Sequence, residues 1–111
     1  MRISEQGEVD GARAAYQQAI DSGHADWAPR AAYHLGVLLT GQDEVDGARA
    51  AYQQAIDSGH ADWAPEAAYH LGVLLTGQDE VDGARAALQQ AIDSAHPEPA
   101  PTAKHLLDEL E

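Results

Sequence analysis

Apolar and polar positions along the middle of the chain follow the spacing of a helix. From residue 44 onward, apolar side chains recur three and four positions apart, as on one helical face: Ala48, Ala51, Tyr52, Ala55 and Ile56. Polar side chains occupy the positions between them. The pattern predicts an amphipathic helix, with Asp46 as its N-cap and Gly59 as a left-handed stop.

A second apolar stretch follows after a short link. Its side chains cover a wider arc, which is typical of a helix with neighbours on two sides: Ala67, Ala68, Leu71, Gly72, Leu74 and Leu75. Asp62 is the predicted N-cap, and Pro65 fits the first turn, where a missing N–H costs little. The turn Gly77-Gln78-Asp79 leads onward. Each unit is therefore predicted to be two antiparallel helices.

The whole unit is repeated. Residues 8–43 recur at 44–79 with one difference in 36 positions, Arg30 becoming Glu66, and a third, divergent copy with a C-terminal capping helix occupies 80–111. Self-similarity at this spacing predicts an all-α stacked array, a single repeat domain over 1–111 with about six helices.

The first helix is expected over about Val9 to Ser22. Residues 1–7 align with the tail of a second helix and are expected to be a truncated remnant of one. The first unit would then expose a helix face through which the chain could form a homo-oligomer.

Several of the repeated positions resemble the tetratricopeptide repeat. The matching set is Leu35-Gly36, Leu39, Ala48, Tyr52 and Ala55, and again Leu71-Gly72, Leu75, Ala84, Leu88 and Ala91. The resemblance implies a right-handed α-solenoid in which the Leu-Gly pair lies at the closest helix crossing. The unit is longer than the usual repeat of about 34 residues. The excess lies in the link, whose Gly-His-Ala-Asp portion is similar to Sel-like repeats.

The same resemblance implies a concave groove lined by the second, inner helix of each unit. The residues carried over are Arg30, Tyr33, His34, Val37, Thr40, Glu66, Tyr69, His70, Val73, Thr76, Thr102 and His105. Stacked Tyr33 and Tyr69 would offer rigid contact area to a peptide. Alternatively, they fill the space between inner helices. The Lys, Arg and Asn with which some family members clamp a C-terminal carboxylate are missing from these positions.

Charge narrows the class of partner. Nineteen acidic residues against six Lys and Arg give a formal charge of −13. This balance argues against nucleic acid and anionic membranes, and leaves proteins or peptides, with a basic partner as one option. Without cysteine, a signal-peptide-like start or an apolar run of membrane-spanning length, a cytoplasmic chain is expected.

Chemistry-bearing residues also repeat with the unit. His24, His60 and His96 recur beside carboxylates, which suggests a metal site, but equivalent positions in stacked helices lie about 10 Å apart. Duplication explains the ladder without a metal. The acids Asp43, Glu44 and Asp46 suit a helix N-terminus and lack the spacing of a calcium loop. No nucleophile or phosphate-binding motif is present, so neither enzymatic activity nor a cofactor is expected.

Two functional hypotheses remain. The first is a peptide-binding adaptor of tetratricopeptide type. The second is an idealised, engineered or recently duplicated structural array without a ligand of its own, which is favoured by the near-identity of two units. Arg30 and Glu66 could form an ion pair across units. Trp27 and Trp63 are expected to pack the links between units.

Replacing Leu71 with alanine tests the predicted core. Loss of a buried leucine side chain and the resulting cavity should lower the free energy of unfolding by about 2–5 kcal/mol. The measurement is a denaturant titration of both chains. A loss below roughly half a kcal/mol would show that Leu71 does not face the core.

Overall fold

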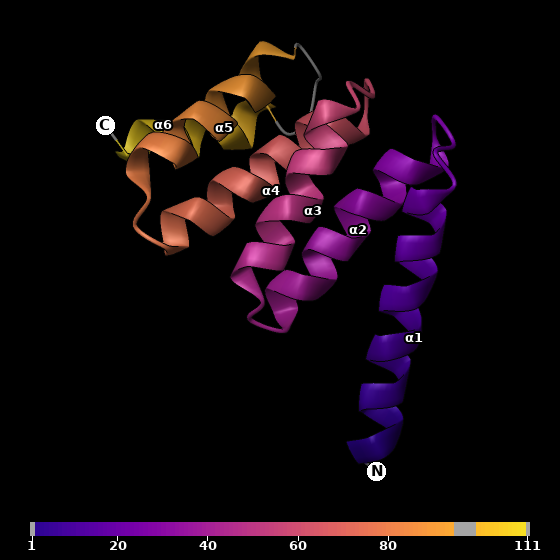
Figure 1. The fold of residues 1–111 in the computed structure, drawn as a ribbon. Coiled ribbons are helices and arrows are strands. Elements are labelled where there is room, and N and C mark those ends of the chain that lie inside the picture. Colours follow the sequence, from indigo (N-terminus) through magenta and orange to yellow (C-terminus); the bar gives the residue numbers. More distant parts are fainter. Residues whose placement is uncertain (1, 95–99, 111) are drawn as a thin grey trace.

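A computed structural model describes residues 2–94 and 100–110, which form six α-helices (Figure 1). They are α1 (Arg2–Asp21), α2 (Trp27–Gly41), α3 (Val45–Asp57), α4 (Trp63–Gly77), α5 (Val81–Asp93) and α6 (Ala100–Leu110). The predicted all-α class is confirmed. The molecule measures 43 × 30 × 19 Å, as suits helix pairs stacked in a row.

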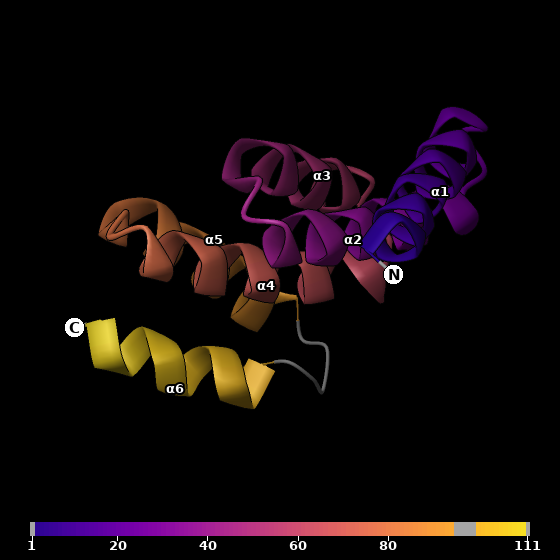
Figure 2. The same cartoon turned by 90° about the horizontal axis from the view of Figure 1, so that it is seen from below.

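The helices stack in chain order. Each packs on the next one along the sequence, and α2 also contacts α4 across the intervening α3. Viewed from below, α2, α4 and α6 form one row of the array, and α1, α3 and α5 form the other (Figure 2). The interior position expected for the second helix of the middle unit is confirmed, since α4 has α2, α3 and α5 as neighbours.

Small residues bring the two rows close together. Ala48, Ala55, Ala84 and Ala91 are fully buried, and the largest fully buried side chains are Tyr52 and Leu88. A Cβ on Gly36 would lie 2.5 Å from the Tyr52 ring, and one on Gly72 would lie 2.5 Å from Leu88. The expected crossing at the Leu-Gly pair is confirmed. Leu71, at 5% exposure, belongs to this core.

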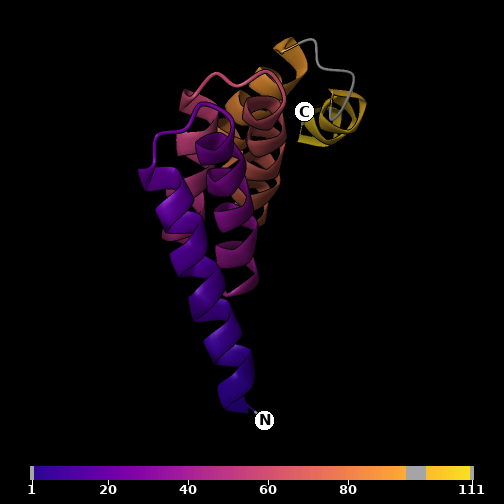
Figure 3. The same ribbon diagram turned by 90° about the vertical axis from the view of Figure 1, so that its right-hand side faces the viewer.

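The first helix begins earlier than expected. α1 is continuous from Arg2, so residues 2–7 extend it and do not form a remnant of an inner helix. At the equivalent turn in the next unit, Asp43 takes a left-handed φ of 59°, whereas Gly7 has no positive φ. Residues 2–4 read Arg-Ile-Ser where the inner helix has Leu-Leu-Thr. α1 projects beyond the other helices (Figure 3).

Helix ends were predicted better than helix starts. Gly23 and Gly59 adopt left-handed φ values of 70° and 69°, as expected of stop signals. The predicted cap Asp46 is wrong, because α3 begins at Val45. Asp62 occupies the predicted N-cap position of α4, but its side chain makes no capping hydrogen bond. Asp62 has helical φ and ψ values of −97° and −46°, whereas an N-cap aspartate needs an extended backbone to reach the first amides.

Ion pairs connect α1, α3 and α5, the outer helices, at equivalent positions of successive units. Arg13 pairs with Glu44, and Arg49 pairs with Glu80, each glutamate preceding the next outer helix. All four side chains are about half exposed, so each pair contributes at most about 1 kcal/mol. Within the third unit, Ala103 of α6 is fully buried, whereas Thr102 is exposed. His96 lies outside the described residues.

Replacing Gly36 with alanine tests the close crossing. The new methyl group would meet the rigid, buried Tyr52 ring, so the free energy of unfolding should fall by about 1–3 kcal/mol. Gly11 is the matched control, since it is also helical but has nothing within 4 Å of the place that a methyl group would take. Gly11→Ala should stabilise α1 by up to about 1 kcal/mol. Equal effects of the two substitutions in urea titrations would contradict the crossing.

Candidate functional site

The residues expected in the groove lie on the inner row of helices. α2 carries five of them, α4 carries the five equivalents, and α6 carries the exposed Thr102 and His105. Val37 and Val73 are 42% and 43% exposed at equivalent positions. The two threonines instead bond to their own helices, since Thr40 and Thr76 each donate to a carbonyl four residues earlier at 2.8 Å.

Tyr33 packs between the first two units. Its ring centroid lies 5.4 Å from Trp63, 5.1 Å from His70 and 6.3 Å from Tyr52. Tyr69 contacts the same imidazole edge-on, with centroids 5.2 Å apart. The two tyrosines therefore both contact His70, in place of the expected tyrosine stack. Tyr33 occupies the space between inner helices.

A polar contact fixes the position of Tyr33. His70 Nδ1 donates to the Glu66 carbonyl at 2.9 Å, which leaves Nε2 to accept from the Tyr33 hydroxyl at 3.3 Å. Burial, followed by the nearby Glu66 and Tyr52 charges, raises the pKa of Tyr33. The hydroxyl therefore stays protonated and can serve as the donor.

Arg30 lies over indole rings. Its guanidinium carbon is 5.6 Å from the Trp27 ring centre and 5.9 Å from that of Trp63. Among the described residues, no ion pair joins Arg30 to Glu66, so the pairing across units that the sequence allows is not formed. Cation–π contacts with two tryptophans hold the guanidinium instead.

Two recesses flank this arginine. One, of about 340 Å³, lies between the units and is lined by Asp26, Trp27, Arg30, His60, Asp62 and Trp63. The other, of about 410 Å³, lies between α1 and α2 and is lined by Tyr16, Ala19, Trp27, Arg30, Ala31 and His34. Burial, with Arg30 as a second cause, lowers the pKa of His34. Its imidazole is therefore neutral at pH 7 and able to accept a hydrogen bond.

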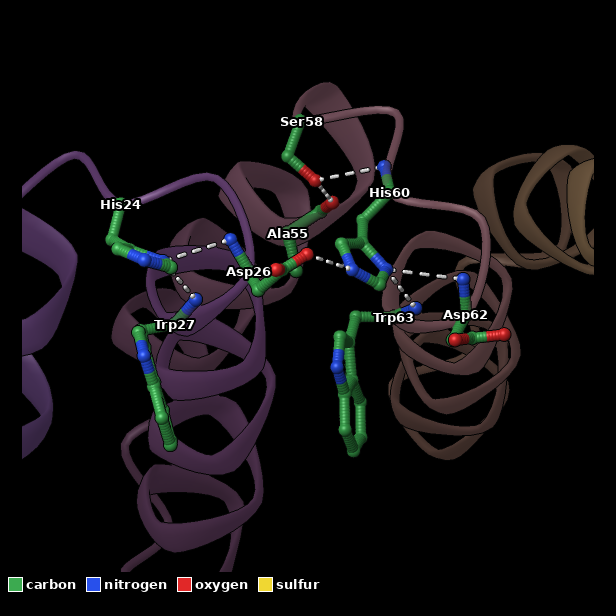
Figure 4. Close-up of polar contacts among 8 residues, drawn as sticks. All are labelled: His24, Asp26, Trp27, Ala55, Ser58, His60, Asp62 and Trp63. Atoms are coloured by element: carbon green, nitrogen blue, oxygen red, sulfur yellow. Dashed lines mark hydrogen bonds and ion pairs between the residues drawn. The ribbon is translucent and has the colours of Figure 1, made fainter.

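The loop histidines begin the inner helices. His60 Nδ1 accepts from the backbone N–H groups of Asp62 and Trp63 at 3.1 and 3.3 Å (Figure 4). His24 does the same for Asp26 and Trp27, both at 3.2 Å. These histidines supply the caps that were assigned to aspartates. The overlooked signal is the spacing Ser-x-His-x-Asp.

The serine of this spacing positions the histidine. Ser58 Oγ donates to the Ala55 carbonyl at 2.6 Å and accepts from the His60 backbone N–H at 3.1 Å. One short hydrogen-bonded chain thus connects the end of α3 to the start of α4. Ser22 makes the equivalent contacts with Ala19 and His24.

His60 also connects two units. Its Nε2 lies 3.1 Å from Asp26 Oδ1, on the preceding inter-helix loop (Figure 4). Because Nδ1 is used as an acceptor, Nε2 carries the proton and donates to this carboxylate. Both ring nitrogens are therefore engaged. Within residues 2–94 and 100–110, no three His, Asp or Glu side chains form a group that could hold a metal ion.

Comparison with known proteins agrees with this architecture of stacked helix pairs. The family model described as tetratricopeptide repeat matches residues 4–62 and 41–100. The chain belongs to the tetratricopeptide repeat family. Among solved structures, it resembles the type III secretion translocator chaperone SycD of Yersinia enterocolitica, with a TM-score of 0.75 and 18% identity over 96% of this chain and 74% of that one. At this identity the likeness concerns the fold. No curated protein matches the chain.

Family membership sets the general class of function. Tetratricopeptide repeats are scaffolds for protein interaction that bind proteins or peptides. In the part of the chain that the structure describes, no helix combines the length and apolar character needed to cross a bilayer.

Replacing His60 and His24 separately with alanine tests the capping and the bridge. Each change removes a helix cap and should cost about 0.5–2 kcal/mol. His60→Ala should cost up to about 1 kcal/mol more, because it also removes the bridge to the largely exposed Asp26. The measurement is urea unfolding at one pH. Equal losses would mean that the bridge adds nothing to stability.

Proposed function

We propose that the chain is a peptide-binding adaptor that uses the face formed by α2, α4 and α6. The observation that carries the proposal is the pair Val37 and Val73, which are exposed on adjacent inner helices. A repeated apolar side chain on one face gives a bound segment two equivalent contacts, one unit apart. The structural neighbour is named a chaperone, which fits a protein as the partner.

The ligand expected from this surface is an apolar segment with basic flanking residues. Two apolar side chains would contact Val37 and Val73. The formal charge of −13 favours a cationic ligand through long-range attraction. Tyr33 contributes by holding α2 and α4 in register, since its ring and hydroxyl are already engaged with the second unit.

The alternative is a structural array without a ligand. The near-identity of residues 8–43 and 44–79 favours it, because a specific site usually needs different side chains in adjacent units. The internal packing of Tyr33 also fits this alternative. The exposed valines favour the adaptor, since a purely structural unit has no need of them.

A selection from a displayed peptide library on the full chain tests the adaptor. Selected peptides should bind at least tenfold more weakly to a Val37→Ser, Val73→Ser double variant, because two apolar contacts are lost. Binding is measured by titration calorimetry. Val81→Ser is the matched control, since Val81 is similarly exposed, at 40%, but lies on the outer helix α5.

Three outcomes decide between the hypotheses. Weaker binding to the double variant with an unchanged Val81 variant supports the adaptor and its face. Binding that depends on Val81 alone would contradict the proposed face. A selection that enriches no peptide would favour the structural array.

A further inference from the structure

The first unit has an open recess at the place where the second unit receives the Tyr33 side chain. The recess of about 410 Å³ between α1 and α2 is bordered by Tyr16, Trp27 and His34. The residues 36 positions later are Tyr52, Trp63 and His70. In the second unit these three surround the Tyr33 ring, with centroid distances of 6.3, 5.4 and 5.1 Å. The occupied site is an internal template for the open one.

Exposure follows the presence or absence of that tyrosine. Tyr52, whose ring Tyr33 covers, is 2% exposed, whereas the equivalent Tyr16 is only partly buried. Ala55 is fully buried, whereas Ala19 is not. Trp27 is 56% exposed, although Trp63 has the same sequence neighbours. The two units differ in sequence only at Arg30 and Glu66. The cover that α2 gives the second unit, with Gly36 against Tyr52 and Tyr33 against Trp63, therefore accounts for the difference.

The contact between the histidine and the tyrosine of the recess also matches the template. His34 stacks on Tyr16 with centroids 5.9 Å apart, much as His70 lies 6.1 Å from Tyr52. In the second unit the imidazole accepts a hydrogen bond from the tyrosine hydroxyl at 3.3 Å. The lowered pKa of His34 keeps its imidazole neutral and so able to accept in the same way.

We propose that this recess is a docking site for a tyrosine side chain of a partner polypeptide, with the ring against Trp27 and Tyr16 and the hydroxyl donating to His34. The site continues the interface that joins the first two units, with the partner in the place that α2 takes in the second. The proposal deepens the proposed function, since it assumes a protein partner, but it does not depend on Val37 or Val73.

A second copy of the chain is a poor source of this tyrosine. Tyr16 lines the recess itself, Tyr33 and Tyr52 are packed between units, and Tyr69 packs against the core of its own chain. On the last inner helix, α6, the position equivalent to Tyr33 is His105. The tyrosines of a second copy are therefore not the expected ligand.

The one difference between the first two units lies at the edge of this site. Arg30 borders the recess, and Glu66 is its equivalent beside Tyr33. Because Tyr33 packs on the second unit with Glu66 at this position, Arg30 is not required for a tyrosine to bind. An Arg30→Glu substitution would make the first unit identical to the second.

The probe is N-acetyl-tyrosinamide, titrated into the full chain and followed by NMR signals of the Trp27 indole and the His34 ring. We expect saturable shifts of both. N-acetyl-phenylalaninamide should bind about three- to tenfold more weakly, because it lacks the hydroxyl that donates a hydrogen bond to His34. His34→Ala should remove this preference, while Val81→Ser, on the outer helix α5, should retain it. Circular dichroism establishes that each variant keeps its helical content.

Other outcomes would overturn the proposal. Shifts confined to Trp63 or Tyr69, or equal affinity for the tyrosine and phenylalanine amides, would show that the template does not transfer. Shifts of Trp27 and His34 on dilution of the chain alone would assign the recess to a second copy. If the Val37→Ser, Val73→Ser variant still binds N-acetyl-tyrosinamide with shifts of Trp27 and His34, this site is separate from the proposed groove. Loss of that binding in the variant would contradict a separate site.

Discussion

The fold depends on the close approach of helices from neighbouring units, α2 against α3 and α4 against α5. Gly36 places a bare backbone against the Tyr52 ring, and Gly72 does the same for Leu88. A Cβ at either position would push the helices apart, and the buried alanines around them would lose contact. The same approach of α2 to α3 brings Tyr33 to 6.3 Å from Tyr52, measured between ring centroids.

Helical spacing predicted those elements whose signals are local. The apolar stripe of Ala48, Tyr52 and Ala55 gave the correct helix, and Gly59 gave its end. The start of α4 could not be read in the same way, because Asp62 is the commoner capping residue and His60 reaches the same amides from further back. The start of α1 was also missed, because the turn found at Asp43 does not form at the equivalent Gly7.

The groove positions came from the family resemblance, and the structure places them on the inner helices. Their roles were harder to predict, because they depend on the adjacent unit. Trp27 and Trp63 have identical neighbours in sequence, yet Trp27 is exposed and Trp63 is covered by Tyr33. Periodicity assigns a residue to a face. It cannot say whether another unit covers that face.

The stacking in chain order affects how such a protein can change during evolution. Each helix contacts its sequence neighbours, and α2 also contacts α4. A duplication that inserts another whole unit would therefore present the same surfaces on both of its sides and disturb no existing interface. The array can lengthen by whole repeat units without compensating substitutions, whereas a shorter insertion between Gly36 and Tyr52 would alter the contact of these two residues.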